Sequence, residues 1–97
     1  MTKVIYKYHL SEPKQITYIK MPVGAEILCC KVQNNDPCVW AIVDKDYVNT
    51  EERIFLILPT GASIPEHPHL KLPGEYIDTI QIHECGVELV FHIFEVT

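Results

Sequence analysis

The 97-residue sequence is poor in the features that define several large classes of protein. It has one arginine, Arg53, and its acidic residues outnumber the basic ones, giving a formal charge of −5. Because nucleic-acid recognition relies on arginine and positive charge, no direct binding of DNA or RNA is expected. Its apolar runs fall short of the roughly 20 residues of a membrane-spanning helix, and no basic start precedes an apolar signal-like stretch. The sequence thus predicts neither a membrane nor a secreted protein.

The spacing of the four cysteines does not favour disulfide bonds or a metal site. Cys29 and Cys30 are adjacent, so on a strand they point to opposite faces and cannot share one role. No C-x₂-C pair exists with Cys38 or Cys85, and we therefore expect reduced thiols and no metal or other cofactor. The pair His67 and His69 is the most ligand-like, and its alternative is a solvated proline loop.

Alanine is scarce, with three residues, whereas isoleucine and valine number twelve and nine. β-Branched residues favour strands, and turn residues recur at short intervals, so we expect an all-β protein of one domain spanning 1–97. Its seven antiparallel strands would form a small barrel or a two-sheet sandwich. The predicted strands are 3–10, 15–21, 25–33, 38–44, 52–58, 75–83 and 87–96.

Segments rich in turn-forming residues separate these strands. Residues 11–14 and 34–37 are rich in proline and polar residues, and the second of these turns makes 25–44 a hairpin. A tight turn at 84–86 makes a second hairpin of the last two strands. Residues 59–73 hold four of the seven prolines, which predicts a long irregular loop of the kind that often carries function.

The segment 25–44 is apolar on both faces of its strands. A small domain has too little of its own chain to cover both faces, so a homo-oligomer is expected. Charge is also uneven: residues 1–20 carry +3 and the remainder −8. This asymmetry either supports head-to-tail association of subunits or has no role.

Three side chains are candidate ligand contacts. Arg53 is flanked by apolar strand residues and must find an acceptor, which is either Glu51, Glu52 or Asp44 or the phosphate or carboxylate of a ligand. Trp40 packs either in the core or against a ligand ring. The large aromatic Tyr76 is a second candidate for stacking.

The segment Thr60-Gly61-Ala62-Ser63 follows a predicted strand and offers backbone N–H groups and two hydroxyls. It is therefore a candidate anion-binding turn, although it has neither the glycine density nor the lysine of a P-loop.

Catalytic chemistry has little support. Neither serine lies in a nucleophile motif, and an enzyme would need His83, His92 and a cysteine to converge in a cleft.

Five strings in order carry a family resemblance: MPVGAEIL at 21–28, WAIVD at 40–44, TEERIF at 50–55, YIDTIQ at 76–81 and LVFHIFE at 89–95. With them the chain resembles a family of about 100-residue proteins of unknown function that is frequent in tailed-phage and prophage genomes. The resemblance implies a phage-type accessory protein in the host cytoplasm without enzymatic activity. The family usually reads G-T-G-H where this chain has Pro59-Thr60-Gly61-Ala62.

These observations lead to three functional hypotheses. The first is a non-enzymatic counter-defence protein that sequesters a small nucleotide-like host signal as a homo-oligomer, through Trp40, Arg53, Tyr76 and the turn residues Thr60, Gly61 and Ser63. The second is a protein–protein inhibitor of a host defence complex, similar to an anti-CRISPR protein. The third is a structural accessory protein without a ligand.

Overall fold

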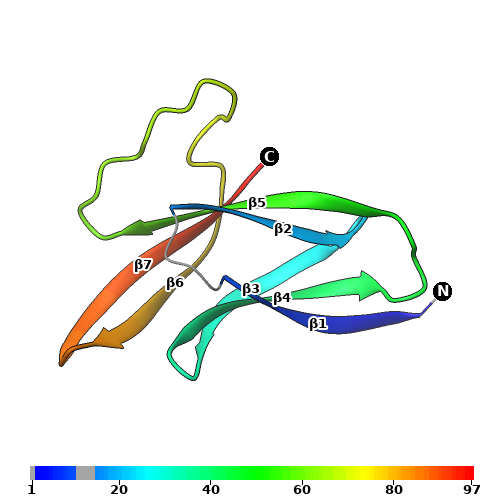
Figure 1. Ribbon diagram of the computed structural model, residues 1–97, viewed down its shortest axis with the longest axis horizontal. Coiled ribbons are helices and arrows are strands. Elements are labelled where there is room, and N and C mark those ends of the chain that lie inside the picture. The colour runs from blue at the N-terminus through cyan, green and yellow to red at the C-terminus, as the bar shows by residue number, and fades with distance from the viewer. Residues whose placement is uncertain (1, 11–14) are drawn as a thin grey trace.

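The computed structural model describes residues 2–10 and 15–97, and these form seven strands and no helix (Figure 1). The strands are β1 (Lys3–His9), β2 (Ile16–Pro22), β3 (Glu26–Gln33), β4 (Asp36–Asp44), β5 (Thr50–Pro59), β6 (Glu75–Glu84) and β7 (Val87–Val96). The all-β prediction is confirmed. Among the described residues no helical segment could cross a bilayer. The turn predicted at 11–14 lies outside the described residues.

Two antiparallel sheets result, here called sheet A, with strand order β1-β4-β3, and sheet B, with strand order β2-β5-β7-β6. Both predicted hairpins are confirmed. The β3–β4 turn holds Asn34 and Asn35 at φ of 52° and 62°, and the β6–β7 turn holds Cys85 and Gly86 at 51° and 75°. Positive φ at both central residues is typical of the type I′ turn. Because two residues suffice for this turn, β4 begins at Asp36, two residues before its predicted start.

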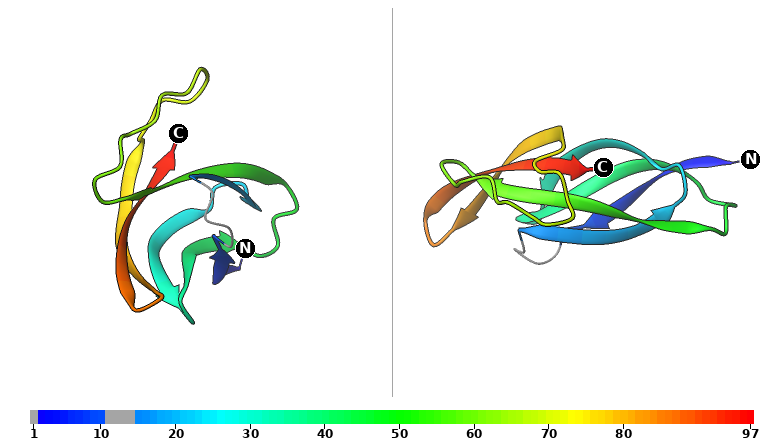
Figure 2. Two further views of the ribbon diagram at one scale, coloured as in Figure 1. Left: turned by 60° about the vertical axis from the view of Figure 1, so that its left-hand side comes forward. Right: turned by 90° about the horizontal axis from the view of Figure 1, so that it is seen from above.

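The sheets curve around a common interior but do not close into a barrel (Figure 2). β3 and β6 lie side by side without a ladder of backbone hydrogen bonds, and β1 and β2 form the other edges of the two sheets. Of the two predicted architectures, the barrel is therefore wrong and the two-sheet sandwich fits.

Polar side chains take the place of a backbone ladder between β3 and β6. The Asp78 carboxylate accepts a hydrogen bond from the Cys30 N–H at 3.3 Å and pairs with the Lys31 ammonium at 3.1 Å. Asn35 donates to the His83 carbonyl at 2.7 Å and accepts from the His83 N–H at 2.9 Å. The edge of sheet A at β3 is thus attached to sheet B.

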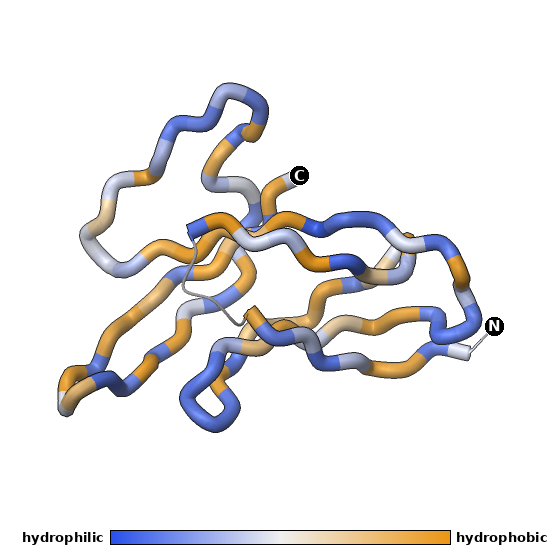
Figure 3. The backbone as a smooth tube through the Cα atoms, in the orientation of Figure 1, coloured by the Kyte–Doolittle hydropathy of each residue, from blue (hydrophilic) through white to orange (hydrophobic). Residues whose placement is uncertain are grey.

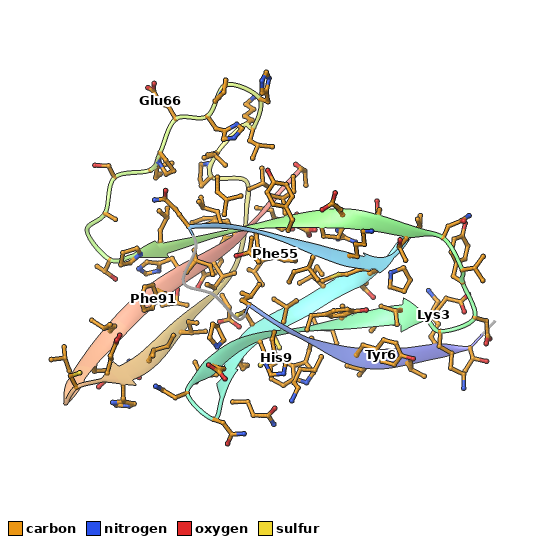
Figure 4. The ribbon with its side chains drawn as sticks, viewed as in Figure 1. Lys3, Tyr6, His9, Phe55, Glu66 and Phe91 are labelled. Atoms are coloured by element: carbon orange, nitrogen blue, oxygen red, sulfur yellow. The ribbon has the colours of Figure 1, made fainter. Side chains whose placement is uncertain are left out.

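The hydrophobic core lies between the two sheets and takes residues from both. Alternate positions of β4 point inward, so Val39, Ala41 and Val43 are buried there. From sheet B, Phe55 and Ile93 are fully buried, and the position of Phe55 at the centre of the molecule can be followed in Figure 4. Burying apolar side chains of this size contributes about 1.5–3 kcal/mol each, which makes this interior the main source of stability.

The predicted long loop runs from the end of β5 to the start of β6 and, as predicted, contains no strand or helix. It leaves the sheet and returns over the outer face of sheet B. There Leu70 and Leu72 pack against the buried Leu56, Leu58 and Val96. The chain therefore covers the apolar part of this outer face with its own loop.

The outer face of sheet A has no such cover among the described residues. Trp40 and Ile42 of β4 are partly exposed, Ile5 of β1 is 59% exposed, and Leu28 of β3 is 45% exposed. None of the four belongs to either hydrophobic cluster, and the apolar run along β4 is visible in Figure 3. The surplus apolar surface expected for segment 25–44 is present, and the homo-oligomer itself stays a prediction.

Candidate functional site

The six predicted contact residues lie in three separate places. Arg53 points into the interior, Trp40 lies on the outer face of sheet A, and Tyr76 lies on the outer face of sheet B. Thr60, Gly61 and Ser63 follow the end of β5, next to β7 of sheet B. The structure therefore brings Tyr76 and the turn into one region and separates both from Trp40 and Arg53.

Arg53 is held by groups of its own chain. Its Nη2 donates to the Glu95 carboxylate at 3.0 Å, its Nε donates to the other oxygen of that carboxylate, and its Nη1 donates to the Ala25 carbonyl at 2.7 Å. Glu51 lies 3.7 Å from Nη1. The hydrogen bond to Glu95 raises the pKa of Arg53 further, so the guanidinium stays charged. A ligand phosphate at Arg53 would have to compete with Glu95.

Glu95 was not among the partners considered from sequence, because it lies 42 residues from Arg53 and meets it only through the pairing of β5 with β7. It is 7% exposed, so this is a nearly buried ion pair. The Ala25 carbonyl belongs to the residue just before β3. Arg53 is therefore a third attachment of β3 to sheet B, beside Asp78 and Asn35.

On the outer face of sheet B, four side chains form one chain of hydrogen bonds, here called the His92 cluster. The Tyr76 hydroxyl lies 2.7 Å from the Thr79 hydroxyl, which lies 3.0 Å from His92 Nδ1. His92 Nε2 lies 2.8 Å from the hydroxyl of Thr60. The Tyr76 ring also meets Phe94 edge-on, with centroids 5.8 Å apart. Residues of β6 and β7 and the residue that follows β5 thus contribute to one polar surface.

The hydrogen bonds of the His92 cluster can run in one consistent direction. A neutral imidazole donates through one nitrogen and accepts through the other. Tyr76 can therefore donate to Thr79, Thr79 to His92 Nδ1, and His92 Nε2–H to Thr60, whose hydroxyl lies 3.5 Å from the Val90 carbonyl.

The turn after β5 is less available to an anion than the sequence suggested. The N–H of Thr60 donates to the Val90 carbonyl at 3.0 Å, and the N–H of Ala62 donates to the Pro59 carbonyl at 3.1 Å. Gly61, at φ +89°, and Ser63 are both exposed. Within the described residues, the N–H groups of Thr60 and Ala62 donate to backbone carbonyls, whereas those of Gly61 and Ser63 do not.

Sequence reasoning missed Thr79 and considered His92 for catalysis together with His83 and a cysteine, not for ligand binding. A signal for their proximity was present, however. A two-residue turn at Cys85 and Gly86 sets the register of the hairpin, and counting back from it places Thr79 opposite His92. The contact from His92 to Thr60 could not be counted in this way because it depends on the pairing of β5 with β7.

The thiols have a different arrangement from the one considered. All four cysteines are free, and Cys38 Sγ lies 3.6 Å from His9 Nδ1 rather than near His83. Burial raises the pKa of the Cys38 thiol and, with Asp78 nearby, raises that of Cys30 to about 12. Both thiols therefore stay protonated at neutral pH, which makes them poor nucleophiles and poor metal ligands.

The pair His67 and His69 lies in the long loop with ring centroids 6.2 Å apart. His67 Nδ1 accepts hydrogen bonds from the N–H groups of His69 and Leu70, each at 3.0 Å, so this nitrogen is used inside the loop. Over residues 2–10 and 15–97, no group of three or more side chains has the geometry of a metal site.

Comparison with known proteins identifies a family and no function. No curated protein and no solved structure matches the chain. A family model described as a domain of unknown function, DUF7352, matches residues 1–97, the whole of the chain. The chain therefore belongs to the DUF7352 family.

Proposed function

We propose that this is a non-enzymatic binding protein that holds a small nucleotide-like anion on the outer face of sheet B, at the His92 cluster. The observation that carries this proposal is the continuous hydrogen-bonded chain from Tyr76 to Thr60 beside the exposed turn at Gly61. The N–H groups of Gly61 and Ser63 would hold the phosphate, and the His92 cluster would fix the Thr60 end of that turn.

The aromatic part of such a ligand would lie against Tyr76, a residue that is 55% exposed and whose ring meets Phe94 edge-on. An aromatic ring held in one orientation loses little entropy when a base stacks on it. Arg53 is not part of this site because it points into the interior, where Glu95 and Ala25 hold it. Trp40 is not part of it because it lies on sheet A.

A small ligand fits the charge of the protein better than a polymer does. The net charge of −5 repels a polyanion, whereas one or two phosphates can be held by local donors. The proposed biological role is counter-defence: the protein would remove a nucleotide-like signal from the host cytoplasm by binding it stoichiometrically. This role rests on the resemblance to proteins of tailed phages and prophages.

Titration calorimetry with adenosine 5′-monophosphate, adenosine and inorganic phosphate tests the proposal. We expect the monophosphate to bind more tightly than either fragment. Tyr76→Ala and His92→Gln should each weaken its binding at least about tenfold, the loss expected for one stacking or one charged hydrogen-bonding contact. Gln81→Ala is the matched control, because Gln81 is exposed on the same face of β6 outside the His92 cluster.

Native mass spectrometry of protein purified from expressing cells provides an independent readout through any retained small molecule. Absence of binding heat for the monophosphate at millimolar concentration, together with no retained mass, would contradict the proposal. The protein–protein inhibitor would then be the better hypothesis.

A further inference from the structure

The free edge of sheet A at β1 has the features of a strand that pairs with another strand. β1 is a regular seven-residue strand without proline or bulge, and it pairs with β4 along its whole length. Its residues Ile5 and Tyr6 are 59% and 45% exposed. Figure 4 shows Lys3, Tyr6 and His9 along this strand at the margin of the molecule. Proteins usually protect such an edge with a proline, a bulge, a covering chain or lysines. Of these devices β1 has lysines, Lys3 and Lys7, but no proline or bulge.

The register of β1 on β4 identifies the backbone groups that point away from the sheet. Leu10 N–H donates to the Pro37 carbonyl and Lys45 N–H donates to the Thr2 carbonyl, so the even-numbered residues form the hydrogen-bonded pairs with β4. The odd-numbered residues therefore direct their N–H and C=O groups toward the free edge. These residues are Lys3, Ile5, Lys7 and His9.

The edge of sheet B at β2 offers less to a partner strand. The pairing of Gln15 with Ile57 leaves the even-numbered residues of β2 pointing outward. The last of these is Pro22, which has no N–H and whose carbonyl already accepts from Ala25. The edges at β3 and β6 are occupied by each other. β1 is thus the most complete free edge that the described residues present.

We propose that β1 pairs antiparallel with β1 of a second copy of this chain, forming a two-fold dimer with one six-stranded sheet, β3-β4-β1-β1-β4-β3. Full overlap of the seven residues places Tyr6 on the two-fold axis, opposite Tyr6 of the partner subunit. In this register the outward-pointing residues pair with one another, Ile5 with Lys7 and Lys3 with His9, so all their backbone groups are satisfied.

The second copy is the occupant that this edge fits best, for two reasons. In a symmetric pairing, the outward-pointing N–H and C=O groups of β1 must bond to the same groups of β1 in the partner subunit. Only registers in which odd-numbered residues face odd-numbered residues allow this. Among these, full overlap places no lysine directly opposite another lysine, whereas centring the axis on Ile5 would pair Lys3 with Lys7 and be destabilised by repulsion.

Sedimentation velocity over a concentration series tests the proposal with the full chain. We expect a concentration-dependent dimer. Ile5→Pro removes an N–H group that makes no hydrogen bond within sheet A of its own subunit. In the dimer the substitution removes two hydrogen bonds, one from each copy of Ile5, and should therefore weaken dimerisation at least about tenfold. The matched control is Lys20→Pro, which places a proline at an outward-pointing position on β2 and should leave the dimer intact. Circular dichroism verifies that both variants fold.

Ile5→Lys provides a second test if the proline variant does not fold, since it keeps the backbone and adds charge at the edge. A monomer at all concentrations up to about 1 mM would overturn the proposal. A dimer that survives both Ile5 variants would also overturn the proposal. Disruption of that dimer by Lys20→Pro would implicate β2, and disruption by Trp40→Glu would implicate the outer face of sheet A.

Discussion

β3 and β1 are the two edge strands of sheet A, and they differ in their contacts to sheet B. β3 is attached to sheet B near its start, its middle and its end, by Arg53, Asp78 and Asn35. β1 pairs with β4, and its Lys7 ammonium donates to Gln33 at the end of β3, but within the described residues no comparable contact attaches β1 to sheet B. One edge is therefore sealed by the side chains of the chain itself, and the other is the edge at which we propose that a second copy pairs.

The largest effect should appear in thiol alkylation. Cys30 of β3 and Cys38, which touches His9 of β1, are both fully buried and have raised pKa values, whereas Cys85 is exposed. A raised pKa lowers the thiolate fraction at a given pH, so Cys30 should react with iodoacetamide at least about a thousandfold more slowly than Cys85. If β1 is the loosely held edge, Cys38 should react before Cys30.

Peptide mapping by mass spectrometry at several times measures these rates. Equal rates for Cys30 and Cys38 would break the comparison, because the two edges would then open together. The rate in urea, where all four thiols should become equivalent, is the control.

The next largest effect should come from the ion pair that attaches the start of β3. Arg53→Ala leaves the nearly buried Glu95 carboxylate without its cation and should lower the free energy of unfolding by about 3–5 kcal/mol. The double variant Arg53→Met with Glu95→Leu should recover much of this loss, since it removes both charges. Urea denaturation provides the measurement. A loss below about 1 kcal/mol for Arg53→Ala would mean that this attachment contributes little.

A smaller effect is expected at the other end of β3. Asn34→Ala and Asn35→Ala both place alanine at positive φ, but only the second also removes two hydrogen bonds to His83. Asn35→Ala should therefore lower the free energy of unfolding by about 1–3 kcal/mol more than Asn34→Ala. Chemical denaturation of the two variants gives this difference directly. Equal losses would indicate strain alone and no attachment between the sheets.

The smallest effect is expected at the exposed partner of Asp78. The Lys31 side chain is 62% exposed, so Lys31→Ala should change the free energy of unfolding by no more than about 1 kcal/mol. The Cys30 N–H would still donate to Asp78 in this variant. A loss as large as that of Arg53→Ala would assign the attachment to the ion pair with Lys31 and not to the backbone hydrogen bond.

The sequence predicted the parts of this fold that depend on neighbouring residues. β-Branched content indicated the strands, and the turns at Asn34 and Gly86 indicated both hairpins, because the physical causes are local. The pairing of β1 with β4 and of β5 with β7 depends on contacts between distant segments, which no local pattern encodes. The partner of Arg53 and the link from His92 to Thr60 therefore could not be predicted, whereas the contact of Thr79 with His92 could.

Amide hydrogen exchange along β1, followed residue by residue at several protein concentrations, tests the account most directly. The amides of Val4, Tyr6 and Tyr8 point toward β4 and bond to it, so they should be protected at every concentration. The amides of Ile5 and Lys7 should exchange rapidly in dilute protein and become protected as concentration rises. Equal protection of both sets at the lowest concentration would mean that the chain covers this edge itself, and would contradict the account.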